Sequence, residues 1–173
     1  VEMAIKHDIA IYSAHTSLDV AADGINTRLA KKIGLKNSRP LIENGLGAIG
    51  ELEEEMNYTD FIGKIRALLD CTYVRYTRPK KEQVKTIALC GGSGAEFIGE
   101  AIAQGADVYI TADCKYHEFQ DAEGRIGLMD IDHWISERHA REIFLDFIGN
   151  LGLDCRISKT DKTPILLWQE QKN

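Results

Sequence analysis

Short apolar runs alternate along the chain with segments in which apolar residues return every three or four positions. The runs have the length and composition of buried strands, and they cover residues 9–13, 84–90, 107–111 and 126–131. The helical spacing covers residues 25–33, 61–69, 97–102, 115–122 and 134–151. Alternating strands and helices are typical of α/β proteins with parallel or mixed sheets, and this is the fold class that we expect.

Weaker patterns add the remaining elements. Residues 45–52 and 72–77 predict further strands, and residues 155–158 and 165–168 predict closing strands. Gly34 is placed to end one helix, and Thr59 is placed to cap the next. The spacing of Val1, Ala4 and Ile5 indicates that the chain begins inside a helix.

Composition narrows the class of protein. The 173 residues are 44% hydrophobic and 28% charged, which is typical of a folded chain rather than a disordered one. The net charge of −6 argues against a nucleic-acid-binding surface, because such surfaces are normally basic. No apolar run approaches the roughly 18 residues of a membrane span, and no signal-peptide pattern opens the chain. The four cysteines lack CxxC spacing and indicate reduced thiols, so we expect a cytoplasmic protein.

Polar residues gather where three of the predicted strands end. His15 and Asp19 follow the first strand, His117 follows the strand of residues 107–111, and His133 follows the strand of residues 126–131. In α/β sheets, ligands bind beyond the carboxyl ends of the strands. These residues are therefore the candidates for chemistry.

His133 and Glu137 are four residues apart, so on a helix they share one face and can bind one metal ion. Together with Asp19 they form a donor set that suits Zn, Mn, Fe or Mg. A surface ion pair is the alternative, because Glu137 can equally pair with Arg141. For Asp19, an ordinary turn aspartate is the alternative.

Gly91, Gly92, Ser93 and Gly94 lie between a predicted strand and a predicted helix, where free N–H groups can bind an anion. The alternative is a tight turn that needs a positive φ. Neither a P-loop nor a G-x-S-x-G elbow is present. Only Cys114 has a nearby histidine, so a thiol enzyme is disfavoured.

Taken together and in order, these segments resemble the Nif-three-like family, dinuclear-metal-centre hexameric proteins often labelled GTP cyclohydrolase 1 type 2 homologues. The stretch AHTSLD from Ala14 resembles the family's A-H-T-x-L-D motif, and CGGSG from Cys90 resembles its central glycine segment. GADVYITADCKYH from Gly105 is similar to its G-A-D-x-Y-I-T-G-D-x-K-Y-H stretch. DIDHWISE from Asp130 resembles its D-x-G-H-x-x-x-E ending, with Asp132 where the family usually has glycine.

The resemblance implies Asp19, His133 and Glu137 as metal ligands, with Glu137 bridging two ions, and His15 and His117 lining the site. Asp132 would add negative charge beside it. The family's adjacent His-His pair has no match, so we expect it upstream of Val1 and expect the metal site of this chain to be incomplete. No catalytic residue is assigned.

The resemblance also implies two interlinked α/β domains and toroidal hexamers. We expect an inner domain at residues 37–125 and an outer domain, lacking its first strands, at residues 1–36 and 126–173. A metal-dependent hydrolase acting on a nucleotide or phosphate-bearing substrate is one hypothesis. A non-enzymatic metal carrier or scaffold is the second, and a catalytically inactive chain is the third.

Overall fold

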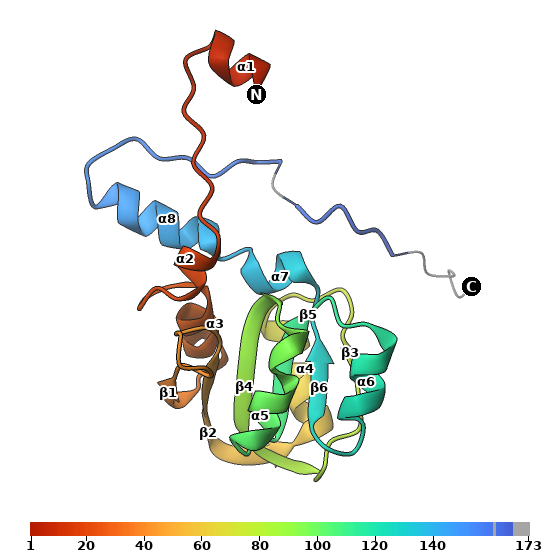
Figure 1. Ribbon diagram of the computed structural model, residues 1–173. Coiled ribbons are helices and arrows are strands. Elements are labelled where there is room, and N and C mark those ends of the chain that lie inside the picture. The colour runs from red at the N-terminus through yellow and green to blue at the C-terminus, as the bar shows by residue number, and fades with distance from the viewer. Residues whose placement is uncertain (161, 168–173) are drawn as a thin grey trace.

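The computed structural model describes residues 1–160 and 162–167, and within them the strands form one mixed six-stranded sheet (Figure 1). The strand order across the sheet is β1-β2-β4-β5-β6-β3. The strands are β1 (Lys36–Arg39), β2 (Ala48–Asn57), β3 (Arg75–Tyr76), β4 (Gln83–Ser93), β5 (Val108–Ala112) and β6 (Gly127–Asp130). β4, β5 and β6 run parallel, and the other pairings are antiparallel. The expected α/β class is confirmed.

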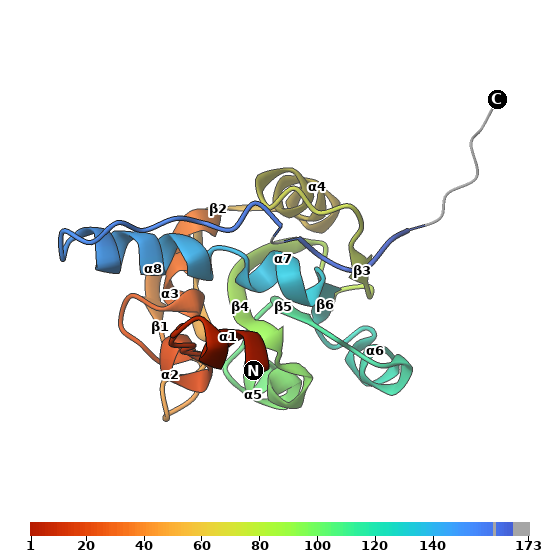
Figure 2. The same ribbon diagram turned by 90° about the horizontal axis from the view of Figure 1, so that it is seen from above.

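Helices cover both faces of this sheet. They are α1 (Glu2–Lys6), α2 (Thr16–Asp19), α3 (Ile25–Ile33), α4 (Tyr58–Leu68), α5 (Ile98–Ala103) after the 3-10 turn η1 (Ala95–Phe97), α6 (Tyr116–Ala122), α7 (His133–Glu137) and α8 (Ala140–Gly149). Figure 2 shows α4 on one side of the sheet and α5 and α6 on the other. α7 lies across the carboxyl ends of the parallel strands (Figure 1).

Alternate residues of the central strands feed two separate cores. Ile87, Val108 and Met129 pack with α3 and α4 in one cluster, and Tyr109 and Leu128 pack with α5 and α6 in the other. β5 is buried at every position, because it is central and covered on both faces. The burial of apolar surface on both sides is the main force that holds the sheet in place.

Several predicted elements are confirmed. The runs at residues 84–90, 107–111 and 126–131 correspond to β4, β5 and β6, and residues 25–33 form α3. Gly34 ends α3 in the left-handed conformation, with φ at 89°. α1 is the helix expected near the start of the chain.

Other predictions are wrong. Residues 9–13 form no strand and are exposed, because no described strand lies beside them to accept their backbone hydrogen bonds. Residues 155–158 and 165–167 form no strand for the same reason, and residue 168 lies outside the described residues. Asn57, not Thr59, caps α4: its Oδ1 accepts the Thr59 N–H at 2.9 Å.

The long helix predicted at residues 134–151 is divided into α7 and α8. His139 lies between them and is 95% buried, and its Nε2 donates to the carbonyl of Ile25 at 3.0 Å. This bond ties the junction to the start of α3 and accompanies the change in chain direction. Helical periodicity could not reveal it, because the partner is 114 residues away.

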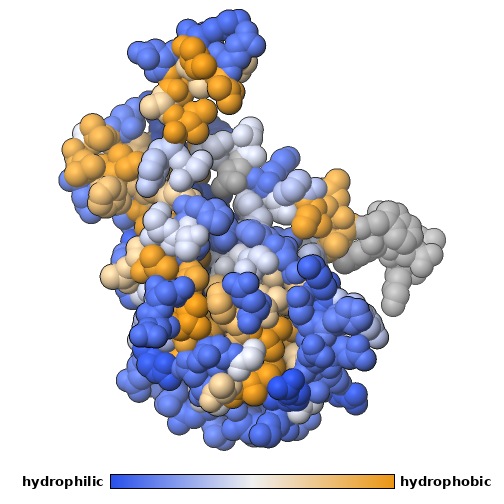
Figure 3. Space-filling model, in the orientation of Figure 1, coloured by the Kyte–Doolittle hydropathy of each residue, from blue (hydrophilic) through white to orange (hydrophobic). Residues whose placement is uncertain are grey.

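β6 belongs to the residues assigned to the outer domain, yet it pairs with β5 of the assigned inner domain. The two-domain division remains a prediction. The N-terminal segment projects from the sheet and carries exposed apolar side chains, among them Met3, Ile5 and Ile11 (Figure 3). None of the helices in the described part of the chain has the length and apolar character that a bilayer crossing demands.

Gly127→Ala is expected to destabilise the fold by about 1–3 kcal/mol, the usual cost of overpacking. A Cβ at this position would lie 2.8 Å from the ring of the buried Tyr58, which has no room to move. Gly63→Ala is the matched control, since Gly63 is an exposed position of α4 with no atom within 4 Å of an added Cβ. The control should gain about 0.5–1 kcal/mol. Urea unfolding measures both values, and equal stability of the two variants would contradict the packing described.

Candidate functional site

A cavity of about 790 Å³ lies beside the carboxyl end of β4, between α2, α7 and α8. Its wall contains most of the candidates from the sequence, namely His15, Asp19, Gly91, Ser93, Asp132, His133 and Glu137. Three chain segments far apart in sequence supply them. Two of these lie at the carboxyl ends of β4 and β6, as the rule for α/β sheets predicts, whereas the segment of His15 and Asp19 follows no strand. His117 lies outside this cavity on the exposed side of α6, with its ring edge-on to Tyr116.

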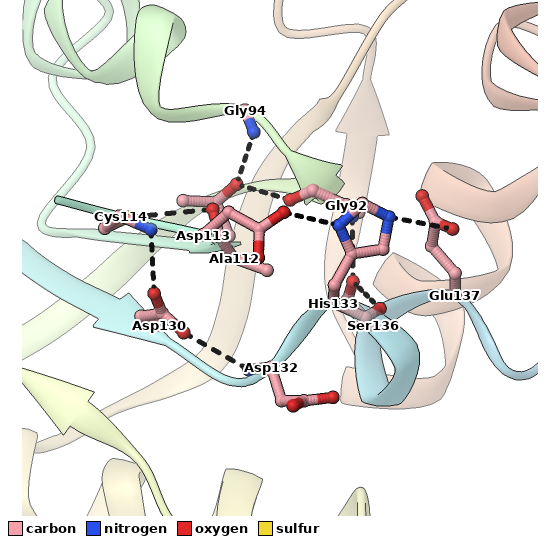
Figure 4. Close-up of polar contacts among 12 residues, drawn as sticks. Gly92, Gly94, Ala112, Asp113, Cys114, Asp130, Asp132, His133, Ser136 and Glu137 are labelled. Atoms are coloured by element: carbon pink, nitrogen blue, oxygen red, sulfur yellow. Dashed lines mark hydrogen bonds and ion pairs between the residues drawn. The ribbon is translucent and has the colours of Figure 1, made fainter. Parts of the chain in front are cut away.

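His133 is held between two carboxylates (Figure 4). Its Nδ1 lies 2.6 Å from Oδ2 of Asp113, and its Nε2 lies 3.3 Å from Oε2 of Glu137. His133 and Glu137 share α7 and are one turn apart, as their spacing predicts. The sequence patterns assign no role to Asp113, because its contact with His133 depends on how β5 and β6 pair.

The glycine segment lies directly against this pair. Gly92 has a φ of 68°, and a Cβ there would lie 2.3 Å from Oε1 of Glu137 and 3.3 Å from Nε2 of His133. Absence of a side chain at Gly92 therefore makes room for both groups. The positive φ is the one that the tight-turn interpretation requires, but Gly92 lies within β4, where the register with β5 is irregular between Leu89 and Ser93, and not in a turn after the strand.

The N–H groups of the glycine segment already have partners. Gly91 donates to Oδ1 of Asn26, Gly92 to Oγ of Ser136, and Gly94 to Oγ1 of Thr111, at 2.8–3.0 Å. An anion would have to displace these acceptors, so the anion-binding interpretation remains a prediction without support from the geometry. These bonds instead fasten β4 to α3, α7 and β5.

Asn26 and Ser136 are buried polar residues that the sequence analysis missed. Asn26 also donates to the carbonyl of Asp19 at 3.2 Å, and Ser136 donates to the carbonyl of His133 at 2.8 Å. Each thus links the glycine segment to a predicted ligand. No local pattern marks them, because their contacts reach across the fold.

The charged forms of the Asp19 and Glu137 carboxylates are disfavoured in this cavity. Burial raises the pKa of Asp19, although the nearby His15 and His133 oppose the shift. Burial also raises the pKa of Glu137, and the charge of Asp19 adds to this effect. For His133, burial lowers the pKa, but Asp113 and Glu137 outweigh it and the net shift is upward. A positive charge placed among these groups would relieve the repulsion.

The donor set fits a divalent cation in chemistry. Asp19, His133 and Glu137 offer two carboxylates and an imidazole in one cavity, the ligands preferred by Zn, Mn and Fe. Among the described residues, however, no three His, Cys, Asp or Glu side chains are close enough together to hold an ion. As they lie in the described part of the chain, these three side chains do not form a metal site.

The sequence model of the Duf34/NIF3 (NGG1p interacting factor 3) family matches residues 1–164. The chain belongs to this family. It is 33% identical over 158 residues to a Nostoc protein named GTP cyclohydrolase 1 type 2 homolog, covering 87% of this chain and 60% of that protein. A Clostridium perfringens protein of the same name is 37% identical over 140 residues, 77% of this chain and 53% of its own length. The chain thus spans a little over half of these curated relatives.

Solved structures share the fold. The crystal structure of Staphylococcus aureus protein SA1388 matches with a TM-score of 0.84 and 26% identity, over 96% of this chain and 72% of that one. Reduced HcgD from Methanocaldococcus jannaschii matches with a TM-score of 0.73 and 27% identity, over 86% of this chain and 60% of HcgD. The family resemblance read from the motifs is confirmed.

Asp132 occupies an unusual backbone conformation for a residue with a side chain. Its φ is 73° and its ψ is 138°, and it is 94% buried. Its Oδ1 accepts the Ile135 N–H at 3.3 Å and so caps α7. The positive φ explains in physical terms why glycine would suit this position, and the cap explains what aspartate contributes.

Asp132→Ala should destabilise the protein by about 1 kcal/mol or more, because alanine loses the cap and keeps the unfavourable φ. Asp132→Gly should cost only a few tenths of a kcal/mol, because glycine loses the cap but relieves the backbone. Chemical unfolding of both variants measures the difference. Equal stability of the alanine and glycine variants would contradict the positive φ described for Asp132.

Proposed function

We propose that the chain binds a divalent metal ion in the 790 Å³ cavity, with Asp19, His133 and Glu137 as ligands. The observation that carries the proposal is that these three donors line one cavity, in which His133 and Glu137 lie one helical turn apart and against Gly92. Family membership supports it, since the resemblance implied the same three residues.

The geometry of the groups supports the proposed ligand roles. Nε2 of His133 faces the carboxylate of Glu137, and the two residues are one helical turn apart. One cation could therefore bind both side chains. Asp19 lines the same cavity and would supply a second carboxylate. A bound divalent cation would act as a Lewis acid that polarises an oxygen of water or substrate. Asp19, His133 and Glu137 are only three ligands. A second metal ion would therefore need ligands from outside this set.

A metal-dependent hydrolase is the activity that we favour. The relatives carry the name GTP cyclohydrolase 1 type 2 homolog, so a nucleotide or another phosphate-bearing molecule is the substrate class to test. We further propose a two-domain organisation and a hexameric ring for the whole protein, in keeping with the family resemblance. The open cavity, bounded by Trp134 and Phe144, leaves room for a substrate ring.

A metal carrier or scaffold is the second candidate. The observation that favours it is the exposure of the donors, since the side chains of His133 and Glu137 are 46% and 35% exposed and an ion held there could exchange. Turnover of nucleotides or phosphoesters by the metal-loaded protein supports the hydrolase. Tight metal binding with no turnover in a broad screen supports the carrier, and absence of metal binding refutes both.

Glu137→Ala should weaken Zn²⁺ or Mn²⁺ binding by more than about 100-fold. Loss of a residue that only supports a metal ligand weakens binding by about 10–100-fold, and loss of a ligand itself should cost more. The reason is that the variant loses a direct ligand. Competition with a chromophoric chelator measures the dissociation constant. Glu142→Ala removes an equal charge from an exposed position of α8 and should bind metal as the wild type does. Equal affinity of the two variants would remove Glu137 from the site.

Gly92→Ala tests whether the glycine makes room for the ligands. Gly105→Ala is the matched control, because Gly105 has a similar φ of 78° but no atom within 4 Å of an added Cβ. Both variants should lose about 1–2 kcal/mol of stability from the positive φ. Only Gly92→Ala displaces Glu137, so only it should weaken metal binding, by about tenfold or more. Identical metal affinity in both variants would contradict the proposed role of Gly92.

A further inference from the structure

Asp113 contacts the candidate site only through His133. Its Oδ2 lies 2.6 Å from Nδ1 of His133, on the side of the ring away from Glu137 (Figure 4). Asp113 is not part of the cavity wall. A carboxylate in this place can act on the site only by what it does to the imidazole.

The loop that carries Asp113 is firmly anchored. Asp113 follows β5 with a φ of 57°, in the left-handed region, which aspartate tolerates better than most residues. The next residue, Cys114, donates its N–H to Oδ2 of Asp130 at 2.9 Å, and its carbonyl accepts Nη2 of Arg75 at 3.0 Å. Asp130 is 99% buried and also pairs with Arg75. The backbone that carries Asp113 is therefore set by the sheet, and the carboxylate, which is half exposed, is held by its contact with His133.

We propose that Asp113 is a positioning residue: it holds His133 in the tautomer with the proton on Nδ1, and so presents the lone pair of Nε2 to the cavity. The claim that this orientation serves metal binding rests on the proposed function. The claim that Asp113 sets the tautomer of His133 applies to the metal-free protein as well. A neutral imidazole has one N–H donor and one acceptor, and a carboxylate lies at each nitrogen of His133. Asp113 is the closer of the two, at 2.6 Å from Nδ1 against 3.3 Å for Glu137 at Nε2, so its contact selects the Nδ1–H form. The remaining nitrogen, which faces Glu137 at 3.3 Å, is then the one free to bind a cation.

The same contact fixes the ring plane. Ring rotation about the Cβ–Cγ bond would break the 2.6 Å contact, so the Nε2 lone pair is aimed before any ion arrives. Such carboxylate–histidine pairs generally raise the basicity of the metal-binding nitrogen and restrict its orientation. Asp113 would therefore raise metal affinity without touching the metal.

The first experiment observes the tautomer directly. The full chain, labelled with ¹⁵N-histidine and free of metal, is studied by long-range ¹H–¹⁵N NMR at mildly alkaline pH, where the ring is neutral. His133→Gln identifies the His133 signals among those of the five histidines. The wild type should show Nδ1–H with an unprotonated Nε2. Asp113→Ala should shift toward the Nε2–H form, whereas Asp121→Ala, which removes an exposed carboxylate from α6, should not.

The second experiment measures Zn²⁺ affinity of the same proteins by chelator competition. Asp113→Ala should bind about 10–100-fold more weakly than the wild type, and Asp121→Ala should bind equally well. Asp113→Asn keeps an oxygen that can accept the Nδ1 proton, so it should retain the tautomer and recover part of the affinity.

The outcomes separate the two proposals. An unchanged His133 tautomer in Asp113→Ala overturns the positioning role, whatever the metal affinity. A changed tautomer with no Zn²⁺ binding to the wild type would refute the metal site while leaving the orienting contact in place. A changed tautomer with unchanged Zn²⁺ affinity would overturn the claim that the orientation serves metal binding.

Discussion

The parallel pairing of β4, β5 and β6 is the constraint on which the candidate site depends. Ser93 pairs with Ala112, and Thr111 pairs with Asp130, so the three strands end at one edge within a few residues of one another. The segment that leaves each strand therefore starts at the same place. Gly92, Asp113 and His133 meet there although up to 41 positions separate them in sequence. A shift of one residue in the pairing of β5 with β6 would move the strand ends relative to one another and separate Asp113 from His133.

Asp130, at the end of β6, stabilises this edge of the sheet through its hydrogen bonds. Its carboxylate is almost fully buried at the end of β6 and accepts hydrogen bonds from Arg75 of β3 and from the N–H groups of Cys114 and Asp132. A buried charge is costly unless such partners surround it, so all three must take up their positions together. The strand pairing, the turn that carries Asp113 and the start of α7 are in this way fixed by one group. The site is rigid because its support is part of the sheet.

Sequence was a good guide wherever one segment decides its own structure. The apolar run of residues 107–111 became a fully buried strand, and the four-residue spacing of His133 and Glu137 became one helical turn. It failed where a distant partner decides. Residues 9–13 have a strand pattern but no described strand beside them, and the predicted long helix breaks where His139 bonds to Ile25. Asp113, Asn26 and Ser136 escaped notice for the same reason, since each acts through a contact made by the fold.

The strained positions explain why the site needs that support. Asp113 and Asp132 both have positive φ, and both flank His133, one at its ring and one before it in the chain. Each such residue costs about 1–3 kcal/mol, which only a surrounding structure that fixes the backbone can sustain. Burial also raises the pKa of Asp19 and Glu137, a second unfavourable feature in the same cavity. Backbone strain and charge repulsion thus coincide beside this cavity. An added cation would relieve the charge repulsion between Asp19 and Glu137, and departures from the most stable arrangement are typical of functional sites.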